Sequence, residues 1–216
     1  MTETMYYLLR PKIGDEQLKE FESILLKQWA PMGFAKTWKP NEAYWKADVD
    51  FETQQINLEG PYVAVDVLPR NFSYEGVMQI HDVARKMFDL EAGGTYGVKF
   101  QGQIESIISR SESEFYGVTP HPTVLDRAAF YWHEIATHQA FHNGNKRTSF
   151  LTALSYLTLN RYRLVGDDLD DAKFYDFTVE ISNGKVNQEE IKLFLLKHVE
   201  IDIERMQKEV ITNDKN

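Results

Sequence analysis

Two long segments with apolar residues at helical spacing constrain the fold of this chain more than any other feature of its sequence. The first covers residues 124–138, and its middle is too apolar to face water. The second covers residues 145–160. Because only a short polar stretch separates them, they predict a central antiparallel pair of packed helices. The apolar residues that define them are Leu125, Ala128, Ala129, Trp132, Ile135 and Ala136 in the first, and Phe150, Leu151, Leu154, Leu157 and Leu159 in the second.

Most of the chain after residue 73 has the same helical period. Helices are predicted over residues 74–88, around 104–108 and over 168–181. Asn187 and Glu190 form the pattern of a capping box, which opens a last helix running to about residue 210. The first of these helices places one apolar face toward the core, formed by Val77, Ile80, His81, Ala84, Met87 and Phe88.

The N-terminal 70 residues have a different pattern. An amphipathic helix is predicted over residues 15–29, and period-two apolar spacing follows over 47–51 and 62–68, with a Gly-Pro turn between the two. We interpret these as a β-hairpin that packs with the helix. The chain is therefore expected to be mainly α: a helical bundle of about six helices over residues 72–205, preceded by a small α+β module over 1–70 and followed by a polar tail over 206–216.

Composition excludes several classes of protein. The 216 residues include 24 Lys and Arg against 33 Asp and Glu, and the formal charge of −9 opposes sequence-independent binding of nucleic acid. The chain has no cysteine, which excludes disulfides, thiolate metal sites and a cysteine nucleophile. No apolar run approaches the roughly 20 residues that a membrane helix needs, and the first ten residues do not resemble a signal peptide. We expect a cytoplasmic protein that binds neither nucleic acid nor membrane.

The polar stretch between the two central helices, residues 138–148, reads HQAFHNGNKRT. Asn143, Gly144 and Asn145 tolerate the positive φ angles that turn successive amide groups toward one point. Lys146 and Arg147 lie in the first helical turn, where the helix dipole disfavours cations, so an anion is expected to compensate. The stretch predicts a phosphate site; the alternative is an ordinary helix start with two solvated basic side chains.

This stretch resembles the signature of the Fic/Doc (Fido) family, His-x-Phe-x-acid-Gly/Ala-Asn-Gly/Lys-Arg. The lysine in place of glycine is similar to the Doc branch. Three further segments, at residues 93–98, 128–129 and 159–164, also resemble Doc proteins, so the likeness covers about residues 72–200, whereas residues 1–70 resemble no family that we can name. The residues in register with the signature are Phe141, Gly144, Asn145, Lys146, Arg147 and Thr148.

The resemblance implies a toxin of a toxin–antitoxin pair that transfers phosphate or AMP from ATP, with Mg²⁺, to a hydroxyl of a target protein. In the Doc branch the group is phosphate and the target is a translation factor, and an antitoxin chain covers the site. Phe141 is implied to be the buried residue that fixes the loop. The implied phosphate ligands are the amides of Gly144 and Asn145 with the side chains of Lys146 and Arg147.

Two positions depart from the signature. Gln139 stands where the family has its catalytic histidine, and an amide cannot accept and hold a proton. Asn143 stands where the family has its metal-binding carboxylate, and is a weaker ligand for Mg²⁺. Three interpretations stay open: an inactive variant, a degenerate relative that binds nucleotide or protein only, or a protein in which His138 substitutes through a re-aimed loop. His142 occupies a variable position that we expect to point away from the phosphates.

A zinc-protease helix is a competing interpretation of residues 133–138, because histidines flank Glu134. The two histidines are five residues apart rather than four, so they do not share a helix face. We therefore expect Glu134 to be a carboxylate on the helix surface and His133 to be half-buried.

Overall fold

The computed structural model describes residues 6–29, 62–87, 95–166 and 171–213. The chain divides into two compact units. Unit 1 comprises residues 1–69, 161–163 and 200–216, and unit 2 comprises residues 70–160 and 164–199.

Unit 1 contains a parallel pair of strands and a helix between them in sequence. Strand β1 (Tyr6–Pro11) pairs with β2 (Tyr62–Val67) from Tyr6 opposite Tyr62 to Pro11 opposite Val67. Helix α1 (Asp15–Trp29) buries Phe21, Ile24 and Leu25, the apolar stripe seen in the sequence. The strand expected at 62–68 is confirmed. Its described partner is β1, which the sequence analysis did not identify; the expected hairpin partner at 47–51 lies outside the described residues.

The C-terminal segment belongs to unit 1 rather than forming a polar tail. Helix α8 (Ile203–Asn213) packs on β1, and Met206 is fully buried there. The expectation of a tail beginning at residue 206 was wrong. Its polar composition hid a helix whose apolar side contacts the strand.

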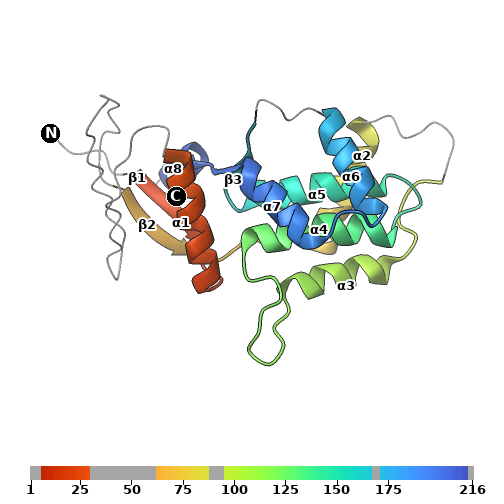
Figure 1. Cartoon of the computed structure of the whole chain (residues 1–216), viewed down its shortest axis with the longest axis horizontal. Helices are drawn as coiled ribbons and strands as arrows, with labels where there is room; N and C mark the ends of the chain where they lie inside the picture. The colour runs from red at the N-terminus through yellow and green to blue at the C-terminus, as the bar shows by residue number, and fades with distance from the viewer. Residues whose placement is uncertain (1–5, 30–61, 88–94, 167–170, 214–216) are drawn as a thin grey trace. The chain divides into compact units, whose positions relative to one another are not determined.

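Unit 2 is a helical bundle in which six helices are described (Figure 1): α2 (Tyr74–Met87), α3 (Gln101–Glu112), α4 (Val124–His138), α5 (Asn145–Leu159), α6 (Asp171–Ser182) and α7 (Gln188–His198). The mainly α fold class is confirmed. Helix α3 is longer than the expected 104–108, and Met87, placed on the core face by its spacing, is 63% exposed at the end of α2.

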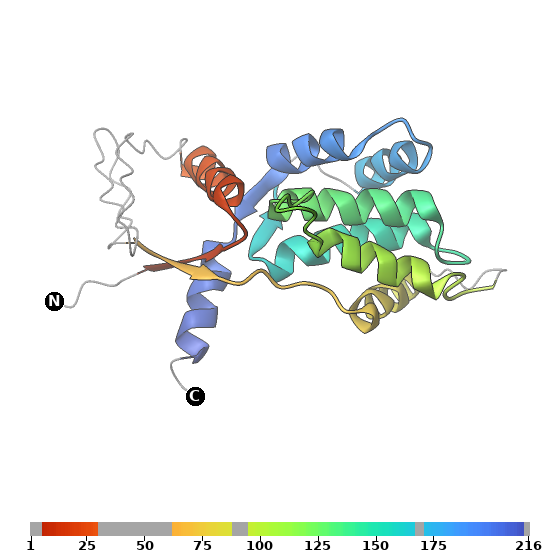
Figure 2. The same ribbon diagram turned by 90° about the horizontal axis from the view of Figure 1, so that it is seen from below.

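Helix α4 is the centre of unit 2. It packs on α3, α5, α6 and α7, and α5 lies alongside it in both ribbon views (Figure 2). Trp132 is fully buried in an aromatic cluster with Phe150, Phe177 and Phe194, at centroid distances of 5.2, 5.6 and 6.0 Å. Its indole N–H donates to Oγ1 of Thr178 at 3.1 Å, so the burial leaves no polar group unpaired. The predicted central helix pair is confirmed with nearly unchanged bounds.

The predicted last helix is divided in the structure. The capping box at Asn187 and Glu190 is present, but α7 ends at His198. Strand β4 (Val199–Ile201) then pairs with β3 (Tyr162–Leu164), and the side chain of Asp202 accepts the N–H of Arg205 to start α8. The break follows from pairing: the β-branched Val199 and Ile201 are buried in a strand, a contact that sequence periodicity does not contain.

No helix among the described residues is long and apolar enough to cross a membrane.

Candidate functional site

The candidate site lies at the loop that joins α4 to α5, residues 139–144, which we call the motif loop. Gln139 ends α4 in the left-handed conformation (φ 50°, ψ 47°), and Gly144 precedes α5 with φ 77°. The glycine adopts this angle without steric cost, whereas the glutamine does not. The two left-handed residues turn the chain so that α5 runs back along α4.

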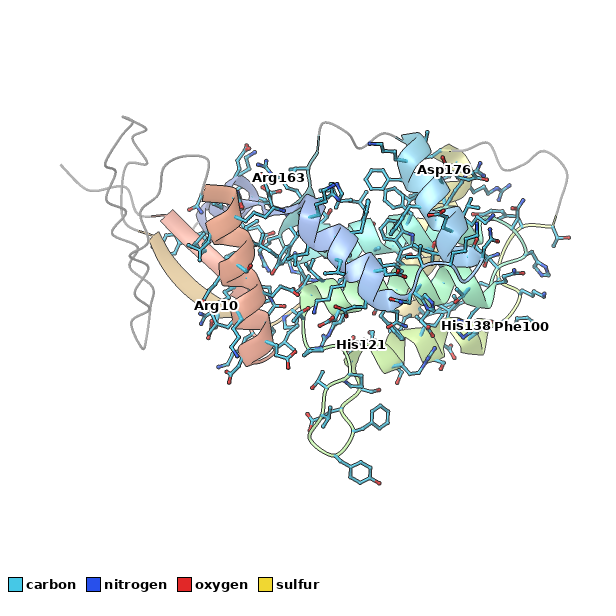
Figure 3. The ribbon with its side chains drawn as sticks, viewed as in Figure 1. Arg10, Phe100, His121, His138, Arg163 and Asp176 are labelled. Carbon is cyan, nitrogen blue, oxygen red and sulfur yellow. The ribbon has the colours of Figure 1, made fainter. Side chains whose placement is uncertain are left out.

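An extended segment, residues 97–100, holds the inner side of the motif loop. Val98 forms an antiparallel bridge with Phe141, and the N–H of His142 donates to the carbonyl of Gly97 at 2.9 Å. The N–H groups of Lys99 and Phe100 both donate to the carbonyl of Ala140, at 2.8 and 3.1 Å. Figure 3 shows Phe100 and His138 at the same end of the bundle, with His121 at the other end of α4. These bonds fix the backbone of the loop from one side.

The side chain of Asn145 holds the loop from within. Its Oδ1 accepts the N–H of Phe141 at 2.9 Å, and its Nδ2 donates to the Phe141 carbonyl at 2.8 Å. The pair needs one acceptor and one donor, which a carboxamide supplies and a carboxylate does not. Phe141 itself is 1% exposed. The side-chain carboxamide of Asn145 is thus engaged within the loop. Only the backbone N–H of Asn145 stays a candidate phosphate donor.

A pocket of about 360 Å³ opens at the outer side of the motif loop. The first turn of α5 and residues of α6 both contribute to its lining. The lining residues are Ala136, Gln139, His142, Asn143, Gly144, Asn145, Lys146, Arg147, Tyr175, Ser182 and Asn183. Every residue of the predicted phosphate stretch from 142 to 147 therefore lines one pocket.

The electrostatics of this pocket suit an anion. Gly144 supplies no side-chain cap, so the first amides of α5 have no partner within the helix. Lys146 has no ion-pair partner among the described residues, and no carboxylate lines the pocket. The pocket thus combines the positive end of the α5 dipole, two cationic side chains and uncapped backbone amides. This combination fits a phosphate group.

The same lining does not fit a metal ion held by the protein. Asn143 offers only a carboxamide, and its Oδ1 already accepts the N–H of Gly144 at 2.7 Å. The described residues also contain no group of three or more His, Cys, Asp or Glu side chains placed to bind a metal ion.

The three residues considered as proton acceptors differ in position. Gln139 lines the pocket and is exposed. His138 does not line it: its Nδ1 lies 3.0 Å from the carbonyl of Glu134 and 3.7 Å from the Glu134 carboxylate. His142 is among the lining residues. Of the two histidines, only His142 belongs to the pocket lining.

Glu134 is not on the helix surface, so that expectation was wrong. It is 5% exposed, and its Oε2 lies 2.6 Å from Nη2 of Arg110, while Nδ1 of His133 lies 3.1 Å from Oε1. Burial raises the pKa of Glu134, but hydrogen bonds from His133 and Arg110, with the nearby charge of His138, lower it to about 2. The ion pair explains the burial of a charged group that sequence periodicity placed toward water.

Sequence reasoning missed part of the pocket. Tyr175, Ser182 and Asn183 come from α6 and its C-terminal end, and no motif marks them. The only signal was Asn183-Gly184, a helix-ending pair, which predicted the end of α6 but not its nearness to the motif loop.

Two comparisons with known proteins found similarity to Fic/Doc proteins. Residues 71–157 match the model of the Fic/DOC family. A curated protein, the toxin Doc of Mycolicibacterium smegmatis, is 33% identical over 82 residues, which span 38% of this chain and 63% of that toxin. The family match includes the motif loop, and this chain spans less than two thirds of the length of the curated toxin.

Proposed function

We propose that unit 2 is a Doc-like Fido domain that binds ATP through its phosphates at the motif loop and the first turn of α5. The observation that carries this proposal is the uncapped N-terminus of α5, which opens with Lys146 and Arg147 into a pocket without carboxylates. The matches to the Fic/DOC family and to a Doc toxin support it. The whole chain then acts as a toxin, with a target protein and an antitoxin as its partners.

The proposed reaction is transfer of phosphate, or of AMP, from ATP to a hydroxyl of the target protein. The attacking hydroxyl must lose its proton as the new P–O bond forms. Gln139 lines the pocket at the position of the family histidine, and its amide does not accept that proton. We therefore propose that the site binds and positions ATP but transfers slowly.

A second candidate function is a nucleotide- or protein-binding module. The neutral Gln139 and Asn143 in the pocket favour it, because both chemical groups expected of a transferase are replaced by amides. Both candidate functions use the phosphate site. They differ in the effect of placing a proton acceptor at residue 139, which restores transfer only if the domain is a transferase.

Calorimetric titration of ATP into the full chain tests the phosphate site. Lys146→Ala removes a charged donor from the lining and is expected to weaken binding at least tenfold, in line with the roughly 1.5–3 kcal/mol of a hydrogen bond to a charged group. Lys86→Ala is the charge-matched control, because Lys86 is an exposed residue of α2 outside the pocket. Absence of binding by the unaltered chain, or equal weakening in both variants, contradicts the proposal.

Restoring the base separates the two candidate functions. Gln139→His, expressed without an antitoxin, is expected to arrest growth and to transfer label from ATP to protein, with γ-label indicating phosphate and α-label indicating AMP. Gln139→Asn is the control, since asparagine accepts the left-handed backbone but no proton. A folded Gln139→His variant that neither arrests growth nor transfers label favours the binding module.

A further inference from the structure

A buried histidine that does not line the pocket contacts the motif loop. His81 lies in α2 and is completely buried. Its ring is stacked against Tyr96 at a centroid distance of 4.2 Å and against Phe141 at 3.9 Å, with interplanar angles of 8° and 20°. The imidazole therefore lies directly against the side chain that fixes the inner part of the loop.

The same imidazole also reaches the first turn of α5. Nδ1 of His81 lies 2.8 Å from Oγ1 of Thr148, which is fully buried. The N–H of Thr148 donates to the carbonyl of Gly144 at 2.9 Å, the bond that closes this turn. His81 thus contacts Phe141 before the turn in the chain and Thr148 after it, and the amides that line the pocket lie between these two contacts.

The histidine is held in its neutral form. Burial lowers the pKa of His81 to about 4; the negative charge of Asp82 opposes this shift and the positive charge of Arg85 adds to it. Tyr96, on the facing segment, donates its hydroxyl to the His81 carbonyl. A neutral ring adds no further positive charge behind the N-terminus of α5 and stacks well between two aromatic rings.

Stability alone does not explain a histidine at this position. Nε2 of His81 is buried without a hydrogen-bond partner among the described residues. An unpaired buried nitrogen opposes folding, and a phenylalanine would fill the same aromatic stack without it. The feature that only histidine provides is the Nδ1 contact with Thr148.

We propose that His81 is a positioning residue for phosphate binding: by joining Phe141 to Thr148, it sets the direction of the first α5 amides toward the pocket. The proposal rests on the proposed phosphate site. It assigns to α2 a role in the site although no residue of α2 lines the pocket.

Two substitutions separate the ring from the hydrogen bond. His81→Phe keeps the stack and removes the contact with Thr148, whereas His81→Asn keeps a polar group near the position of Nδ1 and removes the ring. We expect ATP affinity to fall in the order unaltered chain, His81→Asn, His81→Phe, with at least a fivefold loss in the last. The free energy of unfolding is expected to follow a different order: both variants are less stable than the unaltered chain, and His81→Asn, which loses the buried ring, is less stable than His81→Phe.

If His81 only stabilises the fold, the ATP affinities of the three proteins have the same order as their free energies of unfolding. That result overturns the proposal. His198→Phe is the matched control, because His198 is a buried histidine of α7 that lies against Phe194 at 4.5 Å and outside the pocket lining. Its ATP affinity is expected to equal that of the unaltered chain, and a loss equal to that of His81→Phe also counts against the proposal.

Amide hydrogen exchange in the absence of ligand tests the positioning without relying on ATP binding. The Thr148 N–H is expected to exchange at least tenfold faster in His81→Phe than in the unaltered chain or in His198→Phe. Unchanged exchange at Thr148 overturns the proposal. If the unaltered chain binds no ATP but exchange responds as expected, the proposed function fails while the joining of Phe141 to Thr148 by His81 stands.

Discussion

Tyr116 lies in a tight turn where its backbone conformation is unfavourable for its residue type. Phe115 and Val118 exchange two backbone hydrogen bonds of 2.8 and 2.9 Å, and between them Tyr116 and Gly117 have φ angles of 51° and 78°. Two positive φ angles in a two-residue hairpin are typical of a type I′ turn, which favours asparagine and glycine. The side chain of Tyr116 is fully exposed, so nothing in its contacts offsets the strain of the left-handed backbone.

Tyr116→Asn is therefore expected to raise the free energy of unfolding by about 1 kcal/mol. Urea denaturation of the two proteins measures the difference. Gly117→Ala is the control of opposite sign: its Cβ meets no atom within 4 Å, so only the positive φ lowers stability. An unchanged or lower stability of Tyr116→Asn contradicts the turn assignment.

At the scale of elements, Glu134 of α4 joins its neighbours through one buried carboxylate. Arg110 of α3 pairs with it at 2.6 Å, and Nε2 of Gln188, at the start of α7, lies 3.4 Å from its Oε1. Its pKa of about 2 is below the usual 4.5, so the folded protein keeps the charge at pH values where the unfolded chain takes up a proton. The stabilising contribution is complete above pH 4.5 and is lost as the pH falls from there toward 2.

This linkage predicts a difference between the unaltered chain and Glu134→Gln that depends on pH. At pH 7 the variant is less stable because the buried side chain that Arg110 contacts loses its charge. The difference is expected to shrink by about 2 kcal/mol between pH 7 and pH 3, because the carboxylate takes up a proton in this range and the glutamine does not. Denaturation series between pH 7 and pH 3 measure it. Subtracting the free energy of unfolding of the variant from that of the unaltered chain removes the contribution of groups that titrate in both proteins, such as His81. A difference that does not change with pH contradicts the pairing of Glu134 with Arg110.

At the scale of the whole molecule, both ends of the sequence enter unit 1. Tyr7 and Gln207 exchange two hydrogen bonds, from Tyr7 N–H to Oε1 at 2.8 Å and from Nε2 to the Tyr7 carbonyl at 2.6 Å. Leu9 N–H lies 3.3 Å from Sδ of Met206. Unit 2 is formed from residues 70–160 and 164–199. The contact between β1 and α8 therefore lies entirely within unit 1.

Met206→Ala is expected to destabilise unit 1 by about 2–5 kcal/mol, because it leaves a cavity at a fully buried position. Hydrogen exchange is expected to speed up in β1 and α8 and to stay unchanged in α4. Leu193→Ala, at an exposed position of α7, is the control with a similar loss of apolar volume. Equal loss of protection in α4 contradicts the division into two units.

Sequence reasoning reached the parts of this protein that depend on near neighbours. The bounds of α4 and α5 follow from apolar spacing and from the glycine and asparagine residues that end or start a helix, and the capping box of α7 is a contact between residues three apart. The residues of the motif loop that line the pocket are also adjacent in the chain. Signals of this kind involve residues within one or two helical turns of each other. A short stretch of sequence therefore contains all the residues that decide the local structure.

Other features depend on residues that are distant in the chain. The parallel pairing of β1 with β2, the strand that divides α7 from α8, and the meeting of α6 with the motif loop are long-range contacts without a local pattern. The burial of Glu134 and of His81 is of the same kind, because Arg110 and Thr148, far from them in sequence, supply their partners. A polar residue is placed toward water by its own chemistry, and only the tertiary structure supplies the partner that makes its burial favourable.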